Sequence, residues 1–454
     1  MRDRTPTRRD LLRLFGVGAV GSLAGCPGED RTRRTLTPLR VPTETAPVRT
    51  PTDGLDSIAL ETTLTAADGD SADEFGEAIA VSDDGSIAVV GAPADEDPHG
   101  ELAGSAYVFD SAGGTWTQVA KLVPEDGASF DGFGGAVAVS AAGTTALVGA
   151  PDDENANGNG AGGAYVFDGR DTWHQRAKLT PTDGDRGDAF GQSVALSGSG
   201  TTAVLGAPED EDPNGSLGGS AYVFELTDGS WTQQAKLAAD DGDTFDSFGG
   251  SVTVSDDGET VVVGAHADED PHGELAGSAY VFEATDGGWV QRTKLTPDDG
   301  DRLDRFGWAV DLSGEGTTAL VSAYSAGAGS VSVVELIDGS WSQQATLAAP
   351  DGDDGDFFGF AVALVGADRA VVGAPGDEGP TGGGVGSAYL FERDAGEWTG
   401  TAKFTAAAGD AGDFLGRGVG VSGAGDVIVG APFDTTDDGD SAGSASVFMP
   451  AWSE

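Results

Sequence analysis

Short runs of small and β-branched residues alternate along the chain with short polar links, the pattern of β-strands joined by turns. Between positions 133 and 179 there are four such runs, at residues 135–140, 145–150, 163–167 and 173–179. In the fourth run apolar positions alternate with polar and charged ones, as in an outer strand with one face in water. No stretch shows helical periodicity, so we expect an all-β protein made of four-stranded antiparallel units.

The same set of signals returns every 52 to 58 residues. Each copy contains a Phe-Gly step, with leucine in place of phenylalanine in the last copy: Phe75, Phe133, Phe190, Phe248, Phe306, Phe358 and Leu415. A fixed period of this length indicates one supersecondary unit whose apolar faces are buried against neighbouring copies. Seven four-stranded units predict a seven-bladed β-propeller in preference to an open solenoid. Small residues suit the inner strands, which converge on the axis, and tryptophan suits the wider outer edge.

The copy boundaries predict how the ring closes. Residues 57–64 align with the tryptophan-bearing fourth strand of the other copies, with Ile58 in the tryptophan slot. The last copy ends at residues 444–448, after only three strands. We therefore expect the N-terminal strand to complete the last blade, with Ile58 near Val447, which removes an exposed sheet edge.

Composition narrows the class of partner. The 454 residues carry a formal net charge of −52, with one Cys, two Met and 74 Gly. A single cysteine excludes a disulfide scaffold. A strongly negative surface repels nucleic acid and anionic headgroups, and it is typical of proteins adapted to high salt, where screening tolerates self-repulsion. We expect a monomer with no nucleic-acid partner.

The N-terminal region predicts export and anchoring. Residues 7–13 read Thr-Arg-Arg-Asp-Leu-Leu-Arg, a twin-arginine signal, and an apolar run too short to span a bilayer follows. The run ends in Leu-Ala-Gly-Cys at Cys26, which resembles a lipobox, so Cys26 is the expected site of lipidation. The predicted organisation is a signal peptide at 1–26, a disordered Thr/Pro-rich linker at 27–56, a propeller at 57–449 and a tail at 450–454. The membrane is then reached through the lipid anchor alone.

Two links in most copies are acidic, and in an antiparallel meander both emerge on the same face; in the fifth copy the second link shrinks to Ser-Ala-Gly-Ala-Gly at residues 325–329. The link that enters each copy holds one recurring aspartate: Asp73, Asp131, Asp188, Asp246, Asp304, Asp356 and Asp413. The link after the second strand carries a second acidic set: Asp95, Asp97, Asp153, Asn155, Asp210, Asp212, Asp268 and Asp270. Two interpretations stay open. The recurring aspartate caps a turn through backbone N–H groups, or the two sets coordinate Ca²⁺, the one cofactor that these residues suggest.

Other chemistry is sparse. The five lysines, Lys121, Lys178, Lys236, Lys294 and Lys403, share one outer-strand slot and are expected to form weak surface pairs. Asp311 and Arg417 interrupt the small-residue pattern of the first strand and are the candidates for a channel-facing pair. Asn214 begins an Asn-Gly-Ser glycosylation acceptor. No nucleophile elbow, phosphate loop or metal-binding histidine spacing occurs.

The Phe-Gly and Gly-Ala-Pro steps, as in Phe75-Gly76 and Gly91-Ala92-Pro93, resemble the FG-GAP repeat of integrin α-subunit propellers. The fuller line, through Gly-Ser-Ala-Tyr-Val-Phe to Trp-Thr-Gln-x-Ala-Lys-Leu, is closer to the prokaryotic secreted branch. The resemblance implies a seven-bladed propeller that presents ligand-binding loops on one face, with roles in adhesion or surface recognition. Copies four and five depart from Gly-Ala-Pro, with His266 in place of proline and Ser322-Ala323-Tyr324. The integrin calcium loop is absent from the first hairpin, so those sites are not transferred.

Together these features predict a haloarchaeal type of lipoprotein, exported and held on the outer face of the cell membrane. Its expected function is adhesion or binding, with an acidic loop face that recognises an extracellular protein or glycan, with or without a cation. The alternatives are an extracellular propeller hydrolase or lyase working at the channel mouth, and an envelope-structural protein.

Overall fold

The computed structural model describes residues 55–449 except 59, 97, 156, 171, 212, 270, 299, 407 and 408. Within that range all regular structure is β, and no helix there has the length and apolarity to cross a membrane. The expected signal peptide, the linker up to residue 54 and the tail at 450–454 lie outside the described residues, as does Cys26.

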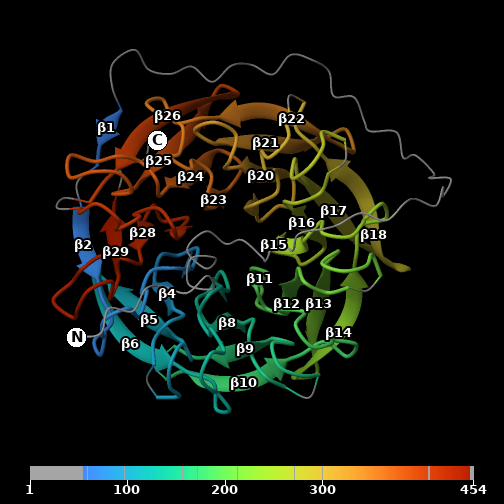
Figure 1. The fold of residues 1–454 in the computed structure, drawn as a ribbon, viewed down its shortest axis with the longest axis horizontal. Helices are drawn as coiled ribbons and strands as arrows, with labels where there is room; N and C mark the ends of the chain where they lie inside the picture. The colour runs from blue at the N-terminus through green and yellow to red at the C-terminus, as the bar shows by residue number, and fades with distance from the viewer. Residues whose placement is uncertain are drawn as a thin grey trace, which may run out of the picture. The chain divides into compact units, whose positions relative to one another are not determined.

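Seven antiparallel blades follow one another around a ring, as expected (Figure 1). The first three blades contain, in chain order, β3 (Ile79–Val81), β4 (Ile87–Ala92), β5 (Ser105–Ala112), β6 (Thr115–Leu122); β7 (Val137–Val139), β8 (Thr145–Ala150), β9 (Gly163–Asp168), β10 (His174–Leu179); β11 (Ser193–Leu196), β12 (Thr202–Ala207), β13 (Ser220–Thr227), β14 (Ser230–Leu237).

The next three blades contain β15 (Phe248–Val254), β16 (Thr260–Ala265), β17 (Ser278–Thr285), β18 (Gly288–Leu295); β19 (Val310–Leu312), β20 (Thr318–Ala323), β21 (Ser330–Ile337), β22 (Ser340–Leu347); β23 (Val362–Val365), β24 (Arg369–Ala374), β25 (Ser387–Asp394), β26 (Glu397–Phe404). The seventh blade contains β27 (Val419–Val421), β28 (Val427–Ala431), β29 (Ser444–Phe448) and, from the other end of the chain, β2 (Leu60–Leu64). The first strands β3, β7, β11, β15, β19, β23 and β27 neighbour one another in that order, and β27 lies beside β3.

Ring closure by the N-terminal strand is confirmed, with one correction. β2 pairs antiparallel with β29, and Thr62 is opposite Val447. The strand starts at Leu60 and not at residue 57, because Asp56–Ser57 forms a separate strand, β1, that pairs parallel with β26 of the sixth blade. The N-terminal segment therefore joins two neighbouring blades.

The core lies between blades, which explains the motif. The phenylalanine of each Phe-Gly step is buried, and Phe75 packs edge-on against Tyr107 and Phe109 with ring centroids 5.5 and 5.9 Å apart. The glycine of Gly-Ala-Pro lets neighbouring backbones touch, since a Cβ on Gly430 would lie 1.9 Å from the carbonyl oxygen of Gly76. Any side chain there would separate the seventh blade from the first.

Candidate functional site

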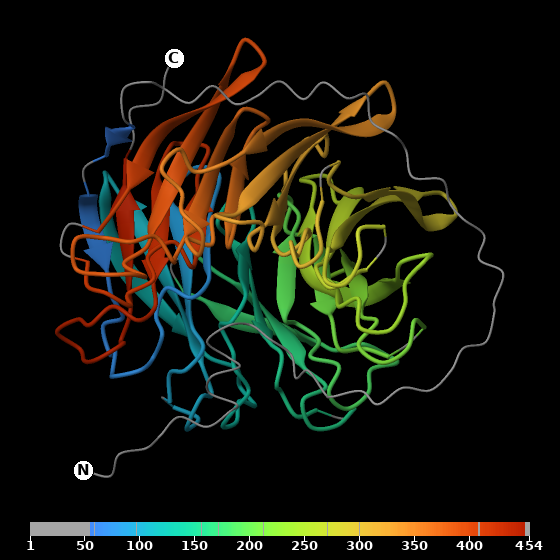
Figure 2. The same ribbon diagram turned by 45° about the horizontal axis from the view of Figure 1, so that its top comes forward.

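The two long links of each copy meet at one end of the ring, as predicted. We call this end the loop face: it comprises the links that lead into the first strand of each blade and the links between the second and third strands. The N–H of Ala94 donates to the carbonyl of Asp73 at 3.3 Å, which joins the two links of the first copy. Phe75 bridges to Gly443 and Phe190 to Gly162, which joins links of adjacent copies. In Figure 2 the long loops of the first blades extend below their strands, and the hairpin between β25 and β26 projects from the opposite end.

The recurring aspartate caps a turn in every copy, which confirms the first interpretation. Its Oδ2 accepts the N–H of the residue three positions earlier at 2.6–2.7 Å in Asp73, Asp131, Asp188, Asp246, Asp304, Asp356 and Asp413. Burial raises the pKa of Asp73 and of Asp188 to about 6 and that of Asp246 to about 7, against an opposing backbone hydrogen bond. Six of the seven capping aspartates are buried and Asp304 is half-buried, so these links are fixed in shape by carboxylates largely removed from water.

Calcium binding by these residues remains a prediction. The Oδ1 atoms of Asp73 and Asp188 are buried without a hydrogen-bond partner, so they are the best-placed oxygens for a cation. Within the described part of the chain, however, no three acidic, histidine or cysteine side chains converge as a metal-binding group. Asp97, Asp212 and Asp270 lie outside the described residues. The Oδ1 of Asn155 accepts the N–H of Asn157 at 2.8 Å, so this side chain shapes its own turn.

The expectation of weak surface lysine pairs was wrong. In five copies the lysine ammonium forms ion pairs with two aspartates, one from each link of the copy. The lysine side chain is only 18–22% exposed. The inner partner is the second-link aspartate at 2.6–2.8 Å, in the pairs Lys121–Asp95, Lys178–Asp153, Lys236–Asp210, Lys294–Asp268 and Lys403–Asp377. The outer partner, at 2.7–3.1 Å, belongs to the entering link: Asp68, Asp126, Asp183, Asp241 and Asp351.

A tyrosine completes each of these groups, which we call lysine bridges. The hydroxyl of Tyr107 donates to Asp95 at 2.7 Å, and the ammonium of Lys121 lies 5.3 Å from the centroid of the same ring. Burial alone would lower the pKa of Lys121, but the hydrogen bonds and charges of Asp95 and Asp68 outweigh it and the pKa is raised. The lysine ammonium therefore pairs with the second-link aspartate, and it ties the two links of its copy to the outer strand.

The sequence held a signal for these bridges. In the fifth copy Ser332 lies opposite Thr346, where other copies have tyrosine opposite lysine. In the seventh copy Ser446 lies opposite Thr63. Tyrosine and lysine are thus present together or replaced together, which is the behaviour of contacting residues.

Asp311 and Arg417 do not form the expected channel-facing pair. The carboxylate of Asp311 accepts the N–H of Leu364 at 2.7 Å and the hydroxyl of Thr253 at 3.2 Å, so it ties the first strands of three blades together. Burial raises its pKa to about 6. Arg417 pairs instead with Glu77 of the first copy, with Nε to Oε2 at 2.6 Å. It precedes β27 by two residues, and so it lies at the end of that strand on the loop face.

Three bulky apolar side chains on the loop face were not singled out from the sequence. Phe130, Phe245 and Leu303 are 49%, 46% and 47% exposed, and their φ angles are 73°, 75° and 77°. Each precedes the recurring aspartate. A bulky residue in the left-handed region is unfavourable, and most other copies have glycine there, such as Gly187. These residues combine backbone strain with apolar exposure.

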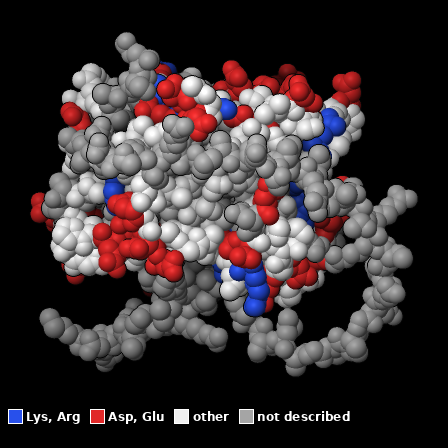
Figure 3. Space-filling model, turned by 90° about the horizontal axis from the view of Figure 1, so that it is seen from above, with Lys and Arg blue, Asp and Glu red and all other residues white. Residues whose placement is uncertain are grey.

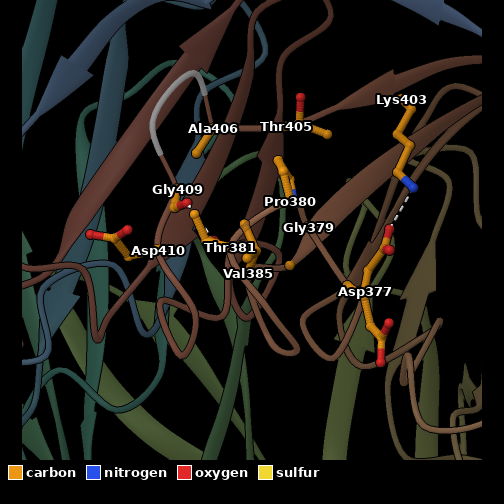
Figure 4. Close-up of a pocket in the computed structure, with 12 residues that line it drawn as sticks. Asp377, Gly379, Pro380, Thr381, Val385, Lys403, Thr405, Ala406, Gly409 and Asp410 are labelled. Carbon is orange, nitrogen blue, oxygen red and sulfur yellow. Dashed lines mark hydrogen bonds and ion pairs between the residues drawn. The ribbon is translucent and has the colours of Figure 1, made fainter.

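The loop face also contains a cavity of about 500 Å³ between the sixth and seventh copies. Asp377 and Lys403 lie at one end and Asp410 at the other, with Thr381 and Val385 between them (Figure 4). The side chain of the predicted glycosylation acceptor Asn214 is engaged elsewhere on this face, where its Nδ2 donates to the carbonyl of Ala239 at 3.2 Å.

Carboxylates are not confined to the loop face. The opposite end, which we call the hairpin face, has exposed Asp83 and Asp84 between β3 and β4, and exposed Asp228 and Asp286 at outer hairpins. Figure 3 shows acidic atoms far outnumbering basic ones and lying near both edges of the view. The predicted concentration of acid on one face is therefore only part of a general acidity.

The fold and its interlocked loops define a β-propeller with one organised face. The FG-GAP repeat family matches seven segments, at residues 59–109, 116–167, 173–224, 231–282, 289–334, 341–391 and 398–448. The chain belongs to this family. Each matched segment joins the outer strand of one blade to the first three strands of the next, the offset that the N-terminal strand predicted. The search of curated proteins gave no match.

Proposed function

We propose that this FG-GAP propeller is a cell-surface binding or adhesion protein that recognises an extracellular protein or glycan through its loop face. FG-GAP propellers are commonly binding domains, which supports a binding role. The observation that carries the proposal is the placement of Phe130, Phe245 and Leu303. Exposed apolar groups on strained backbone reduce stability, so a partner that covers them gives a reason for their presence on one face.

The interlocked links support recognition by a preorganised surface. Capping aspartates and lysine bridges hold the loops in one conformation, so little ordering entropy is lost on binding. Strong negative charge favours a neutral or basic partner over an anionic one. A cation assists in this proposal by joining the free Oδ1 of Asp73 or Asp188 to oxygens of the partner.

The proposal includes export by the twin-arginine pathway, lipidation of Cys26 and display on the outer face of the cell membrane. The acidic composition supports a high-salt habitat such as that of haloarchaea. Asp311 and Arg417 have structural partners, which weakens the alternative of a hydrolase or lyase at the channel mouth. An envelope-structural role differs from binding in needing no discrete ligand.

Capture from cell-surface extracts at high salt tests the proposal. Immobilised protein should retain a defined partner, and the variant Phe130→Gly/Phe245→Gly should retain much less. A matched control changes the hairpin face, Asp228→Asn/Asp286→Asn, and should retain as much as the wild type. Equal capture by all three proteins would refute the loop face as the binding surface.

A chelator added to the same experiment separates the cation from the partner. If a cation is used, EGTA lowers capture by the wild type, and Asp73→Asn/Asp188→Asn becomes insensitive to EGTA. Undiminished capture in EGTA would remove the cation from the proposal and leave the binding role in place.

A further inference from the structure

Departures from the repeat motif gather on the loop face, where the first and second strands of the fourth to sixth copies begin or end. The residue after each Phe-Gly step is glycine in two copies and glutamine in a third, but Trp308 and Phe360 in the fifth and sixth copies. The residue after Gly-Ala is proline in most copies, but His266 and Tyr324 in the fourth and fifth. All four positions lie at the loop-face ends of the first or second strands, which are the strands nearest the axis.

These four side chains form one cluster, which we call the aromatic cluster. The ring of Trp308 lies 5.0 Å from that of His266, 4.6 Å from that of Tyr324 and 5.6 Å from that of Phe360, between centroids. Tyr324 also lies 5.8 Å from Phe360. His266, Trp308 and Phe360 are half-buried and Tyr324 is 9% exposed, so the cluster is packed on one side and open on the other, with Tyr324 at its base.

The polar atoms of the aromatic cluster have no protein partner among the described residues. The other five tyrosines donate their hydroxyl groups to buried aspartates, as Tyr280 does to Asp268 at 2.6 Å. The hydroxyl of Tyr324, the indole N–H of Trp308 and the imidazole of His266 form no hydrogen bond with any residue that the structure describes. Burial and the charge of Arg305 lower the pKa of His266 to about 3, so its ring is neutral and offers one donor and one acceptor.

The cation stacked on the aromatic cluster is already engaged. The guanidinium of Arg417 lies 5.2 Å from the centroid of Phe360 and 5.6 Å from that of Phe433, and Glu77 neutralises it. An anionic ligand would have to compete with Glu77 for this group and enter a strongly negative field. The groups left to contact a ligand are thus aromatic rings and neutral hydrogen-bond donors and acceptors.

We propose that the aromatic cluster binds a neutral carbohydrate. A sugar ring has an apolar C–H face that packs on aromatic rings, and hydroxyl groups at its edge that exchange hydrogen bonds with neutral polar tips. Neither kind of contact depends on ion pairing, so ionic screening at high salt does not weaken it. The inference rests on the proposed function and assigns it a ligand class. Its binding site, the aromatic cluster, is separate from the apolar residues Phe130, Phe245 and Leu303.

A printed array of neutral and carboxylate-bearing oligosaccharides, probed with the full-length protein in molar salt, tests this inference. The protein should bind to spots of neutral glycans and should not bind to spots of carboxylate-bearing ones. With the best neutral glycan, Tyr324→Phe should weaken binding about fivefold to tenfold, since it removes one hydrogen bond and keeps the ring. Trp308→Ala should abolish binding. The matched control Trp289→Phe alters a half-buried tryptophan on β18 and should leave the affinity unchanged.

The outcomes are distinguishable from those of the capture experiment. The inference would be overturned if the protein bound no neutral glycan on the array, or if the wild type and both cluster variants bound with equal affinity. If capture from surface extracts still depended on Phe130 and Phe245, the proposed function would stand without it. If Tyr324→Phe unfolds with the same urea midpoint as the wild type, loss of fold is excluded as the cause of weakened binding.

Discussion

Removing the ammonium group from one lysine bridge measures how much the bridge contributes to stability. In the fourth blade the Nζ of Lys294 lies 2.7 Å from Asp268 and 3.0 Å from Asp241. The side chain of Lys294 is 18% exposed and that of Asp268 only 4%. Lys294→Met keeps most of the side-chain volume and leaves the carboxylate of Asp268 buried without its cation.

Two reference values bracket the expected loss. An exposed ion pair contributes about 0.2–1 kcal/mol, and removal of one partner from a buried pair costs about 3–5 kcal/mol. Because Lys294 is partly exposed, we expect Lys294→Met to lower the free energy of unfolding by about 2–3 kcal/mol. Adding Asp268→Asn removes the stranded charge, so the double variant should be more stable than Lys294→Met alone.

The matched control is an ion pair of equal length in full contact with water. Arg302 and Glu274 are 2.7 Å apart, with side chains 62% and 66% exposed. Arg302→Met should cost under about 0.5 kcal/mol. Urea is the denaturant of choice because it does not change ionic screening, and coincident fluorescence and circular dichroism curves establish two-state unfolding. Equal losses for Lys294→Met and Arg302→Met would refute the distinction between lysine bridges and surface pairs.

Three further predictions follow from the capping aspartates, the strained residues and the ring closure. The folded-state pKa of Asp246 is raised to about 7, so the folded protein takes up a proton as pH falls and this group destabilises the fold at higher pH. Asp246→Asn should therefore raise stability by about 2 kcal/mol at pH 8, with the gain shrinking toward pH 4 in urea titrations at constant salt; a gain independent of pH would contradict this. Phe245→Gly should stabilise by about 0.5–1 kcal/mol in the same assay, since it relieves the positive φ angle; a loss would show that Phe245 is held by packing. Starting the chain at residue 65 removes β2 and should produce aggregation in size-exclusion chromatography, whereas starting at Leu55 should give a monomer.

The ring was predictable because its determinants repeat. Each Phe-Gly step fixes a buried ring and a close backbone contact, so copies of the motif count the blades. The role of β2 followed from alignment with the outer strands. The pairing of β1 with β26 was not predictable, since two residues of parallel pairing leave no hydrophobic pattern.

The local electrostatics were predicted less well. The slot shared by the lysines was visible, but its burial depends on links that fold back over the outer strand, a contact between residues about 50 positions apart, such as Lys294 and Asp241. The joint replacement at Ser332 and Thr346 was the available clue. Arg417 was misplaced because its neighbours suggested a strand, whereas β27 starts at Val419. The aromatic cluster escaped notice because its members come from three different copies.

The double attachment of the N-terminal segment determines how the protein would respond to mechanical tension. If residue 26 is held by the membrane and the loop face grips a neighbour, the pull enters the body through β1 and then β2. Peeling would first release the two-residue pairing with β26 and then unzip β2 from β29. The pairing that closes the ring would be lost one residue pair at a time, before any complete blade unfolds.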